Sequence, residues 1–208
     1  MKKTLITLCL LLTATWSQAT LSITTTLPVA ITDGSPVGIV SQGTVSGLGA
    51  GHVVSSITVG LNVTGGFDGN LYAYLVHDGT VVTLLNHIGS TAPFGSLASG
   101  FGNGTDNSFL LSAVTGSDLY GTAGNGTAGQ ALTGTFQVAG LSGFTGSTAN
   151  GQWTLFFADT VRGGGTSTLQ SWTLNITAVV PEPVTLALVT FAAMLLALTA
   201  LKWVWRAK

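Results

Sequence analysis

An uncharged apolar segment near the C-terminus places the strongest constraint on how this chain can fold. Eighteen residues, from Val184 to Leu201, contain no charged side chain. As a helix rising about 1.5 Å per residue, they would extend roughly 27 Å, close to the hydrocarbon thickness of a bilayer. Pro181 and Pro183 separate such a helix from the preceding chain. The segment therefore predicts a single transmembrane helix, since a helix buried in a soluble core is normally shorter and carries a polar face.

The seven residues that follow, 202–208, suit a membrane boundary. Trp203 and Trp205 are the residue type that gathers at the lipid–water interface. Lys202, Arg206 and Lys208 supply the positive charge that favours the cytoplasmic side. We therefore expect the rest of the chain to lie outside the cytoplasm, anchored to the membrane by this helix.

The whole tail, 181–208, also has a recognisable order. Pro181, Glu182 and Pro183 are followed by the apolar segment 184–201 and then by the basic end. In this order the tail resembles the PEP-CTERM sorting signal of bacterial surface proteins, whose motif these three residues match one by one. The resemblance implies that a membrane transpeptidase, an exosortase, cleaves near the motif and passes the protein to the cell surface or the extracellular space.

The start of the chain has the pattern of a secretory signal peptide. Two lysines precede an apolar run over 5–12, and small residues at Ser17 and Ala19 suit a cleavage site. The run is too short to span a membrane by itself. We expect residues 1–19 to be removed by cleavage after Ala19. Cys9, the only cysteine, lies in this segment, so the mature chain has no disulfide and no cysteine-based metal site.

The predicted extracytoplasmic domain, 20–180, is nearly free of charge. It contains six Asp, no Glu, no Lys and a single basic residue, Arg162. A domain with one basic residue has no electrostatic footprint for nucleic acid, so a nucleic-acid partner is excluded. Low charge together with many Gly, Thr and Ser is typical of an extracellular β-protein with neutral polar faces.

Alternating apolar and polar residues predict the strands of this domain. Over 56–63, Ile57, Val59, Leu61 and Val63 share one face, as expected of a half-buried strand. Further strands are predicted at 71–76, 80–85, 109–113, 135–138, 152–158 and 171–176.

Turn residues connect two pairs of these strands. Asp78-Gly79 joins the second and third as a tight hairpin turn. Gly163-Gly164-Gly165 separates the last two, as a hairpin or a loop. No helical periodicity precedes the tail. The pattern predicts an all-β fold, an antiparallel jelly-roll-like β-sandwich.

Two sequence segments of this domain resemble the P domain of proprotein convertases. The first runs from Asn70 to Thr80 (NLYAYLVHDGT), and the second is a closing block from Ala149 to Ile176 containing Trp153, Asp159 and Trp172. The likeness covers most of 30–177. It implies a jelly-roll β-sandwich whose final strand pair is the closing block, and a module that is non-catalytic in its family.

Residues for catalysis are sparse. The histidines are His52, His77 and His87, and no Gly-x-Ser-x-Gly elbow exists for a serine hydrolase. His77 and His87 end the two arms of the same predicted hairpin, which separates them too far for a two-histidine metal site. Exposed strand-end imidazoles are the alternative interpretation of these histidines. We therefore expect no enzymatic activity and no cofactor.

Calcium is the one metal that the aspartates suggest. Asp68, in Gly-Phe-Asp-Gly-Asn, and Asp159, directly after a predicted strand, offer hard oxygen ligands. The alternative is that both carboxylates only shape turns, where Asp is favoured for backbone reasons.

Two classes of function remain open. The first is an exported structural or interaction protein of the cell envelope or of the extracellular polysaccharide matrix. The second is a module that binds polysaccharide or a surface protein, for which Tyr72, Tyr74 and Tyr120 are the candidate contact residues. Tyr72 and Tyr74 share a strand face opposite Leu71 and Leu75. Burial of that tyrosine face would remove the best feature of the carbohydrate interpretation.

Overall fold

A computed structural model describes residues 18–88, 107–119 and 131–180, together with residues 191, 193, 194 and 197. Several predicted features lie outside the described residues. They are residues 1–17 of the predicted signal peptide (1–19), Tyr120, the predicted motif Pro181–Pro183, most of 184–201 and the basic end 202–208. Within the described part of the chain, no helix has the length and apolar character needed to span a membrane.

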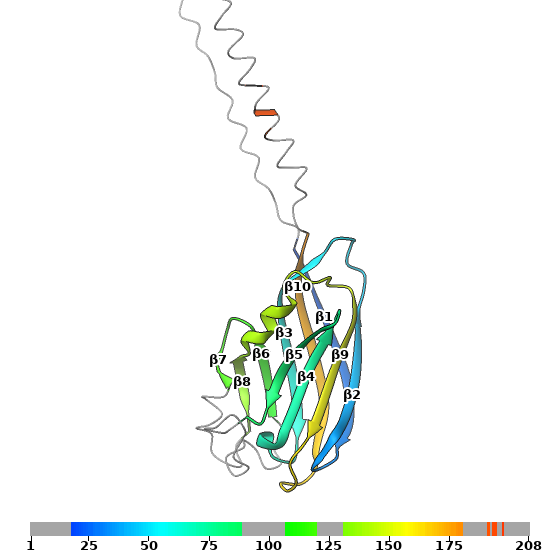
Figure 1. Cartoon of the computed structure of the whole chain (residues 1–208), viewed down its shortest axis with the longest axis vertical. Coiled ribbons are helices and arrows are strands. Elements are labelled where there is room, and N and C mark those ends of the chain that lie inside the picture. Colours follow the sequence, from blue (N-terminus) through cyan, green and yellow to red (C-terminus); the bar gives the residue numbers. More distant parts are fainter. Residues whose placement is uncertain are drawn as a thin grey trace, which may run out of the picture. The chain divides into compact units, whose positions relative to one another are not determined.

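Residues 18–179 form one compact unit built from two β-sheets (Figure 1). The larger sheet has six strands, in the order β1 (Gln18–Ile31), β10 (Ser167–Val179), β3 (Val53–Thr64), β6 (Asn107–Ser112), β8 (Thr133–Gln137) and β7 (Ser117–Asp118). The smaller sheet has four, in the order β2 (Ser35–Val45), β9 (Gly151–Asp159), β4 (Leu71–His77) and β5 (Thr80–Asn86). Two 3₁₀ segments, η1 (Asp68–Asn70) and η2 (Ala139–Phe144), join strands of different sheets.

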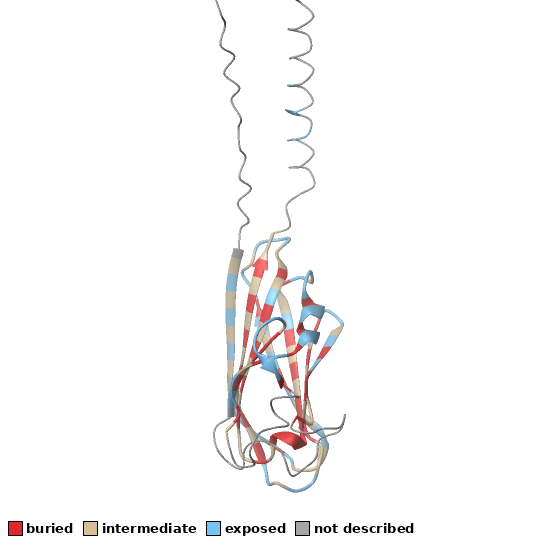
Figure 2. Cartoon of the chain, turned by 90° about the vertical axis from the view of Figure 1, so that its left-hand side faces the viewer, coloured by how far each residue is buried: buried red, intermediate tan, exposed pale blue. Residues whose placement is uncertain are grey.

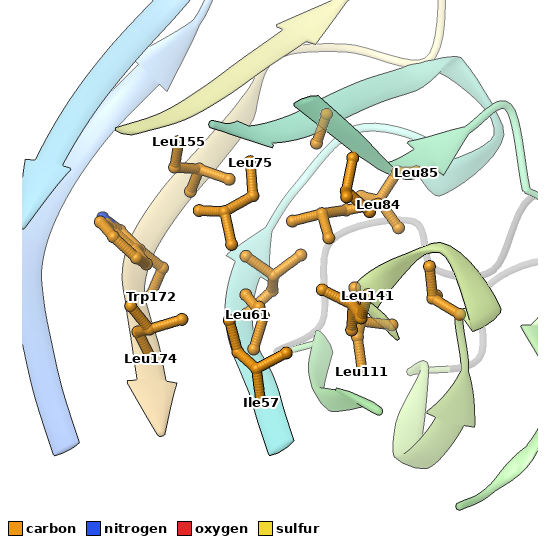
Figure 3. Close-up of a cluster of buried hydrophobic side chains, with 14 of the residues drawn as sticks. Ile57, Leu61, Leu75, Leu84, Leu85, Leu111, Leu141, Leu155, Trp172 and Leu174 are labelled. Carbon is orange, nitrogen blue, oxygen red and sulfur yellow. The ribbon is translucent and has the colours of Figure 1, made fainter. Parts of the chain in front are cut away.

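The core lies between the two sheets and is made by the alternation read in the sequence. In β3, Ile57, Val59, Leu61 and Val63 are buried, and each is followed by a more exposed residue. Figure 3 shows Leu61 of β3 and Leu174 of β10 facing Leu75 of β4 and Leu155 of β9 across the interior. Figure 2 shows the same alternation as buried bands along the strands. The prediction of an all-β sandwich is confirmed.

The prediction that the sheets are antiparallel is wrong for two pairs. β8 runs parallel to both β6 and β7. Parallel neighbours need a connection of about a dozen residues or more, and the twenty residues between β6 and β8 supply it. The Gly-rich composition of this stretch does not reveal in which direction the chain returns to the sheet.

The last two strands do not form a hairpin. β9 pairs with β2 and β4, whereas β10 pairs with β1 and β3, so the triple glycine lies in a loop that crosses between the sheets. Trp153 of β9 and Trp172 of β10 are both fully buried, each on the inner face of its own sheet.

The two ends of the sandwich differ. Gln18 pairs with Val179, so the chain segments before β1 and after β10 leave the sandwich from the same end. The β1–β2 turn, η1 and the β9–β10 connection lie together at the other end, the lower one in Figure 1. We call the group formed by Asp33, Asp68, Asn70, Asp159 and Ser167 at that end the crossover end.

Candidate functional site

The crossover end is built where the chain passes from one sheet to the other. Asp68 and Asn70 belong to η1, which leads from β3 of the larger sheet to β4 of the smaller one. Asp159 is the last residue of β9 and precedes the crossing back to β10, where Ser167 is the first residue. Asp159 lies opposite Leu71 in the β4–β9 register, and the Thr160 amide donates to the Asn70 carbonyl at 3.0 Å. The two connections are therefore joined directly.

Asp159 is a buried carboxylate with an incomplete set of partners. Its side chain faces the interior, like that of Phe157 two residues earlier, and the residue has 0% exposure. Oδ1 accepts a hydrogen bond from the Val161 amide at 3.3 Å. Oδ2 is buried and has no hydrogen-bond partner among the described residues. Burial of an unpaired oxygen on a charged group is costly.

Asn70 presents a second unused acceptor. Its Nδ2 donates to the carbonyl oxygens of Val161 at 3.2 Å and Gly163 at 2.6 Å. Since both partners are acceptors, the nitrogen must face the β9–β10 connection and the amide oxygen must point elsewhere. That oxygen, Oδ1, is buried without a hydrogen-bond partner in the described structure.

The carboxyl groups of this end have raised pKa values. Burial raises the pKa of Asp68 from 3.8 to about 8. Burial is also the main cause that raises the pKa of Asp159 to about 6, and the negative charge of Asp33 adds to it. Hydrogen bonds from the backbone amides of Val161 and Gly34 oppose the rise. In both aspartates burial thus favours the protonated form of the carboxyl group.

The remaining members of the crossover end add oxygens rather than positive charge. Asp33 accepts the Gly163 amide through Oδ1 at 3.0 Å and Oδ2 at 3.2 Å. Ser167 is fully buried, and its hydroxyl has no hydrogen-bond partner among the described residues. A Cβ at Gly66 would lie 2.0 Å from that hydroxyl, so only glycine allows the chain before η1 to approach Ser167. Arg162, the one basic residue of the domain, is exposed.

The structure brings the two calcium candidates, Asp68 and Asp159, to the same end of the sandwich. Asp68 lies in a turn, as its sequence suggested, but it is buried. Sequence reasoning missed Asn70, although Asn70 lies two residues after Asp68 and directly precedes a predicted strand. Nothing in the local sequence indicated Ser167, because its burial depends on the facing sheet.

His77 and His87 lie at opposite ends of the β4–β5 hairpin, as the sequence predicts. His77 is at the Asp78-Gly79 turn, while His87 lies at the far end of the hairpin, where its amide donates to the Leu71 carbonyl. The alternative that they are exposed imidazoles is wrong for His77, which is 1% exposed. Its ring stacks on a buried tryptophan of the neighbouring strand, a contact that the local sequence does not reveal.

His87 does reach the crossover end. Its Nδ1 lies 3.1 Å from the Gly69 carbonyl oxygen and its Nε2 lies 3.2 Å from the Thr160 hydroxyl. Gly69 and Thr160 are the sequence neighbours of Asp68 and Asp159, so one histidine and two aspartates do share this end. The two carboxylates are 1% and 0% exposed, however, and a substrate in solution has no access to them.

The tyrosine candidates lie on the outer face of the smaller sheet. Tyr72 and Tyr74 are half-buried, and they point away from the core that Leu71, Ala73 and Leu75 face. The predicted division of this strand into two faces is confirmed. Tyr120, the third candidate, lies outside the described residues.

Sequence reasoning missed the third ring of this surface. The register places Val40, Phe156, Tyr74 and Thr83 in one row across the four strands, which we call the outer row. The rings of Tyr74 and Phe156 stack with centroids 4.6 Å apart and planes 14° apart. This separation is close to the spacing between strands, so the two rings stand upright and cover one face of each other.

Two surface depressions offer no acid–base chemistry. One lies on the outer face of the larger sheet and is lined by residues such as Asn62, Ser108, Thr173 and Asn175. The other lies beside η2 and is lined by residues such as Ser55, Thr58 and Ser142. Their linings contain no Asp, Glu, His, Lys, Arg or Cys.

No protein-family model matches this chain, and no curated protein matches it in sequence. Among solved structures, similar chains include the serine protease of Aeromonas sobria, alone and in the complex of that protease with the chaperone ORF2. Each comparison has a TM-score of 0.48 and 16% sequence identity, and covers 77% of this chain. The matched region spans only 27% of the chain of known structure, and a likeness of this extent carries no conclusion about activity or partners.

Proposed function

We propose that this chain is an exported, non-catalytic surface protein that an exosortase-type transpeptidase sorts through its C-terminal tail. Its β-sandwich serves a structural or interaction role in the cell envelope or in the extracellular polysaccharide matrix. The observation that carries the proposal is the order of the tail, with Pro181-Glu182-Pro183 before an uncharged segment of eighteen residues and a basic end. The apolar run after Lys2 and Lys3 supports export.

The attachment of the sandwich is compatible with anchoring through the tail. β1 and β10 pair along their length, so the segment before Gln18 and the segment after Val179 leave from one end. Cleavage after Ala19 would remove two pairs of this ladder, Gln18 with Val179 and Ala19 with Ala178, and would leave the rest intact. Both processing events therefore concern one end of the domain and spare its core.

The non-catalytic role rests on the chemistry that the described residues offer. The aspartates that share an end with a histidine are buried, and the two depressions described above are lined by neutral groups. The P-domain resemblance supports the same role, and it assigns the sandwich more specifically to the jelly-roll type.

The direct test is the mass of the protein recovered from its native cell surface, with mapping of its C-terminal peptide. We expect loss of the residues after the motif, near residue 183. As a variant, Glu182→Ala should leave an unprocessed chain ending at Lys208 in the membrane fraction. Val184→Ala, which alters the neighbouring position and preserves the motif, serves as the control and should be processed normally.

An intact C-terminus in the wild-type surface protein would contradict the sorting proposal and leave a membrane-anchored β-domain. Equal processing of Glu182→Ala and the wild type would contradict the role of the motif while preserving export. Retention of residues 1–19 in the surface protein would contradict the signal peptide.

A second candidate function is a binding module that uses the outer row. Val40 and Val81 on this face are 62% and 59% exposed, and the rings of Tyr74 and Phe156 lie between their strands. A sugar ring stacks on the open face of an aromatic ring, and the stacking of Tyr74 on Phe156 covers one face of each ring. The geometry therefore favours an apolar protein surface over a polysaccharide as the occupant of this face.

This second candidate is tested by binding of the wild type and of Tyr74→Ala to cell-surface protein and to matrix polysaccharide from the native cells. Loss of protein binding in the variant supports the outer row as a protein contact. Loss of polysaccharide binding instead would identify the face as a sugar platform. Unchanged binding of both kinds would exclude the outer row.

A further inference from the structure

The outer face of the larger sheet is neutral and polar over most of its width. Its strands β1, β10, β3, β6 and β8 contain no Asp, Glu, Lys, Arg or His. The alternation that buries the aliphatic residues of these strands turns mostly Thr, Ser and Asn to the outside. One row of this face, across β10, β3 and β6, consists of Ser171, Asn62 and Ser108. The face therefore offers many hydrogen-bonding groups and no charge.

A depression lies in this face over β10, β3, β6 and β8. Its volume of about 440 Å³ is within the range of about 300–1,000 Å³ that is usual for small-molecule sites. Polar side chains line it on both sides of β3, with Ser171, Thr173 and Asn175 on β10 and Ser108 and Thr135 on β6 and β8. Because each hydroxyl and each side-chain amide both donates and accepts, the lining can bind groups of either kind.

Gly60 contributes to the depression by having no side chain. It lies in the interior of β3, opposite Thr173 of β10 and Leu110 of β6. A Cβ at Gly60 would lie 3.5 Å from the Thr173 Cβ and 3.8 Å from the Leu110 Cδ1, which is ordinary van der Waals contact, and its φ is not positive. The described neighbours of Gly60 therefore do not require glycine. Glycine weakens a strand interior, and there it often marks a site where a ligand approaches the backbone closely.

Asn62, two residues further along β3, has an amide oxygen without a partner. Its Oδ1 is buried and forms no hydrogen bond in the described structure. Buried polar atoms of folded proteins almost always have a partner, so this oxygen is an exception that calls for one. Since an amide has an acceptor end and a donor end, rotation of the Asn62 side chain would present either end to a hydroxyl group in the depression.

We propose that this depression binds a neutral polysaccharide, whose chain lies over Gly60 and whose hydroxyl groups form hydrogen bonds with Asn62 and the neighbouring Ser and Thr side chains. A sugar hydroxyl both donates and accepts, as do the groups of the lining. The lack of charge on these five strands suits an uncharged polymer and gives an acidic one no counter-charge. The inference rests on the proposed role in the extracellular polysaccharide matrix and assigns that role to one face of the sandwich.

Other occupants fit the depression less well. Nucleic acids and anionic lipids are attracted by basic residues, and these five strands contain none. An apolar protein surface would need apolar side chains in the lining. Leu61 and Phe109 are buried in the core, which leaves Leu110 as the apolar side chain that the lining presents. Hydrogen bonds to hydroxyl groups therefore supply most of the recognition that this face can offer.

The test is retardation of the purified full chain in native gels that contain polysaccharide. The probe is the matrix polysaccharide of the native cells, separated by anion exchange into a neutral and an acidic fraction. The detergent is a polyoxyethylene ether, because a detergent with a sugar headgroup would compete for the depression. We expect the neutral fraction to retard the wild type increasingly as its concentration rises, and the acidic fraction to have little effect.

Two variants locate the binding. Gly60→Val fills the depression and should weaken binding about tenfold, as expected when one or two hydrogen bonds are lost. Asn62→Leu removes the amide and should weaken binding as well.

Both variants should unfold at or above the midpoint temperature of the wild type. A β-branched residue suits a strand interior better than glycine, and Asn62→Leu replaces a buried unpaired oxygen with an apolar group of similar shape. Loss of binding at full stability would therefore separate loss of the site from failure to fold. Gly143→Ala, at an exposed position of η2, is the control and should bind like the wild type.

Three results would overturn the proposal. The first is an absence of retardation of the wild type by the neutral fraction. The second is equal or stronger retardation by the acidic fraction, which would show that the ligand is charged. The third is full binding in both Gly60→Val and Asn62→Leu, which would place the contact elsewhere on the chain. None of these results bears on sorting, which is decided separately by the mass of the C-terminal peptide.

Discussion

The imidazole of His77 lies flat on the indole of Trp153, with ring centroids 3.8 Å apart and planes 5° apart. His77 ends β4 and Trp153 is near the start of β9, the neighbouring strand of the smaller sheet. Both residues are buried. The His77 Nε2 is 2.7 Å from the Thr148 carbonyl oxygen, and its Nδ1 is 2.9 Å from the Gln152 carbonyl oxygen. His77 therefore links the β4–β5 hairpin to the segment that leads into β9.

His77→Ala should lower the free energy of unfolding by about 2–4 kcal/mol, because it opens a cavity beside Trp153 and removes the hydrogen-bonding groups that face two carbonyls. Urea unfolding of the full chain in a nonionic detergent, followed by tryptophan fluorescence, measures the change. His52→Ala is the control, since His52 is half-buried and its ring forms a hydrogen bond with the Gly49 carbonyl in its own turn. Its cost should stay below about 1 kcal/mol. Equal costs would contradict the structural role of His77.

A hydrogen bond between Trp172 and Ser41 connects the two sheets through the core. The Trp172 Nε1 of β10 donates to the Ser41 hydroxyl of β2 at 2.8 Å, and both residues are buried. Trp172→Phe should cost about 1–3 kcal/mol, since it removes the donor and part of the packing. The double variant with Ser41→Ala should cost less than the sum of the single variants by about 0.5–1.5 kcal/mol. If the cost of the double variant equals the sum of the two single costs, the Trp172–Ser41 hydrogen bond contributes nothing to stability.

The turn between β4 and β5 depends on its glycine. Asp78 and Gly79 have φ values of 47° and 76°, as a type I′ hairpin turn requires. Gly79→Ala meets no neighbouring atom but adopts a strained backbone, which should cost about 1–2 kcal/mol. Gly143→Ala in η2 is the matched substitution, since its nearest atom would be at 3.7 Å and its φ is not positive. Thermal unfolding should show that Gly143→Ala changes the free energy of unfolding by no more than about 0.5 kcal/mol. A larger loss of stability in Gly143→Ala than in Gly79→Ala would contradict the requirement for glycine in the β4–β5 turn.

Adjacent residues of β4 should respond differently to truncation. Leu75 is fully buried in the core, so Leu75→Ala should cost about 2–5 kcal/mol. Tyr74 is half-exposed on the outer row and loses mainly its stacking with Phe156, worth about 0.5–1.5 kcal/mol beyond area burial. Denaturant midpoints of the two variants provide the comparison. The reverse order of the two losses would place Tyr74, rather than Leu75, in the core.

Several parts of the fold follow from local pattern. The alternation in β3 predicts which side chains are buried, and the same pattern in β4 separates its tyrosine face from its leucine face. Asp78-Gly79 predicts the hairpin because the turn needs two residues that tolerate positive φ. Each of these features depends on residues close together in the sequence.

Other parts could not be predicted in this way. No strand was expected before residue 56, because β1 and β2 are rich in Thr, Ser and Gly and alternate poorly. Yet β1 pairs with β10 and β2 pairs with β9, so both strands are formed by partners more than a hundred positions away. The direction of β8 and the separation of β9 from β10 likewise depend on distant pairing.

The candidate site shows the same division. The sequence by itself determined that the domain has several aspartates, almost no basic residue and two carboxylates beside predicted turns or strands. Only the tertiary structure decided that Asp68 and Asp159 share an end, that Asn70 aims its nitrogen at the β9–β10 connection, and that their oxygens are buried. The physical reason is that alternation specifies which face a side chain occupies, whereas burial and charge balance are set by whichever distant segment packs against that face.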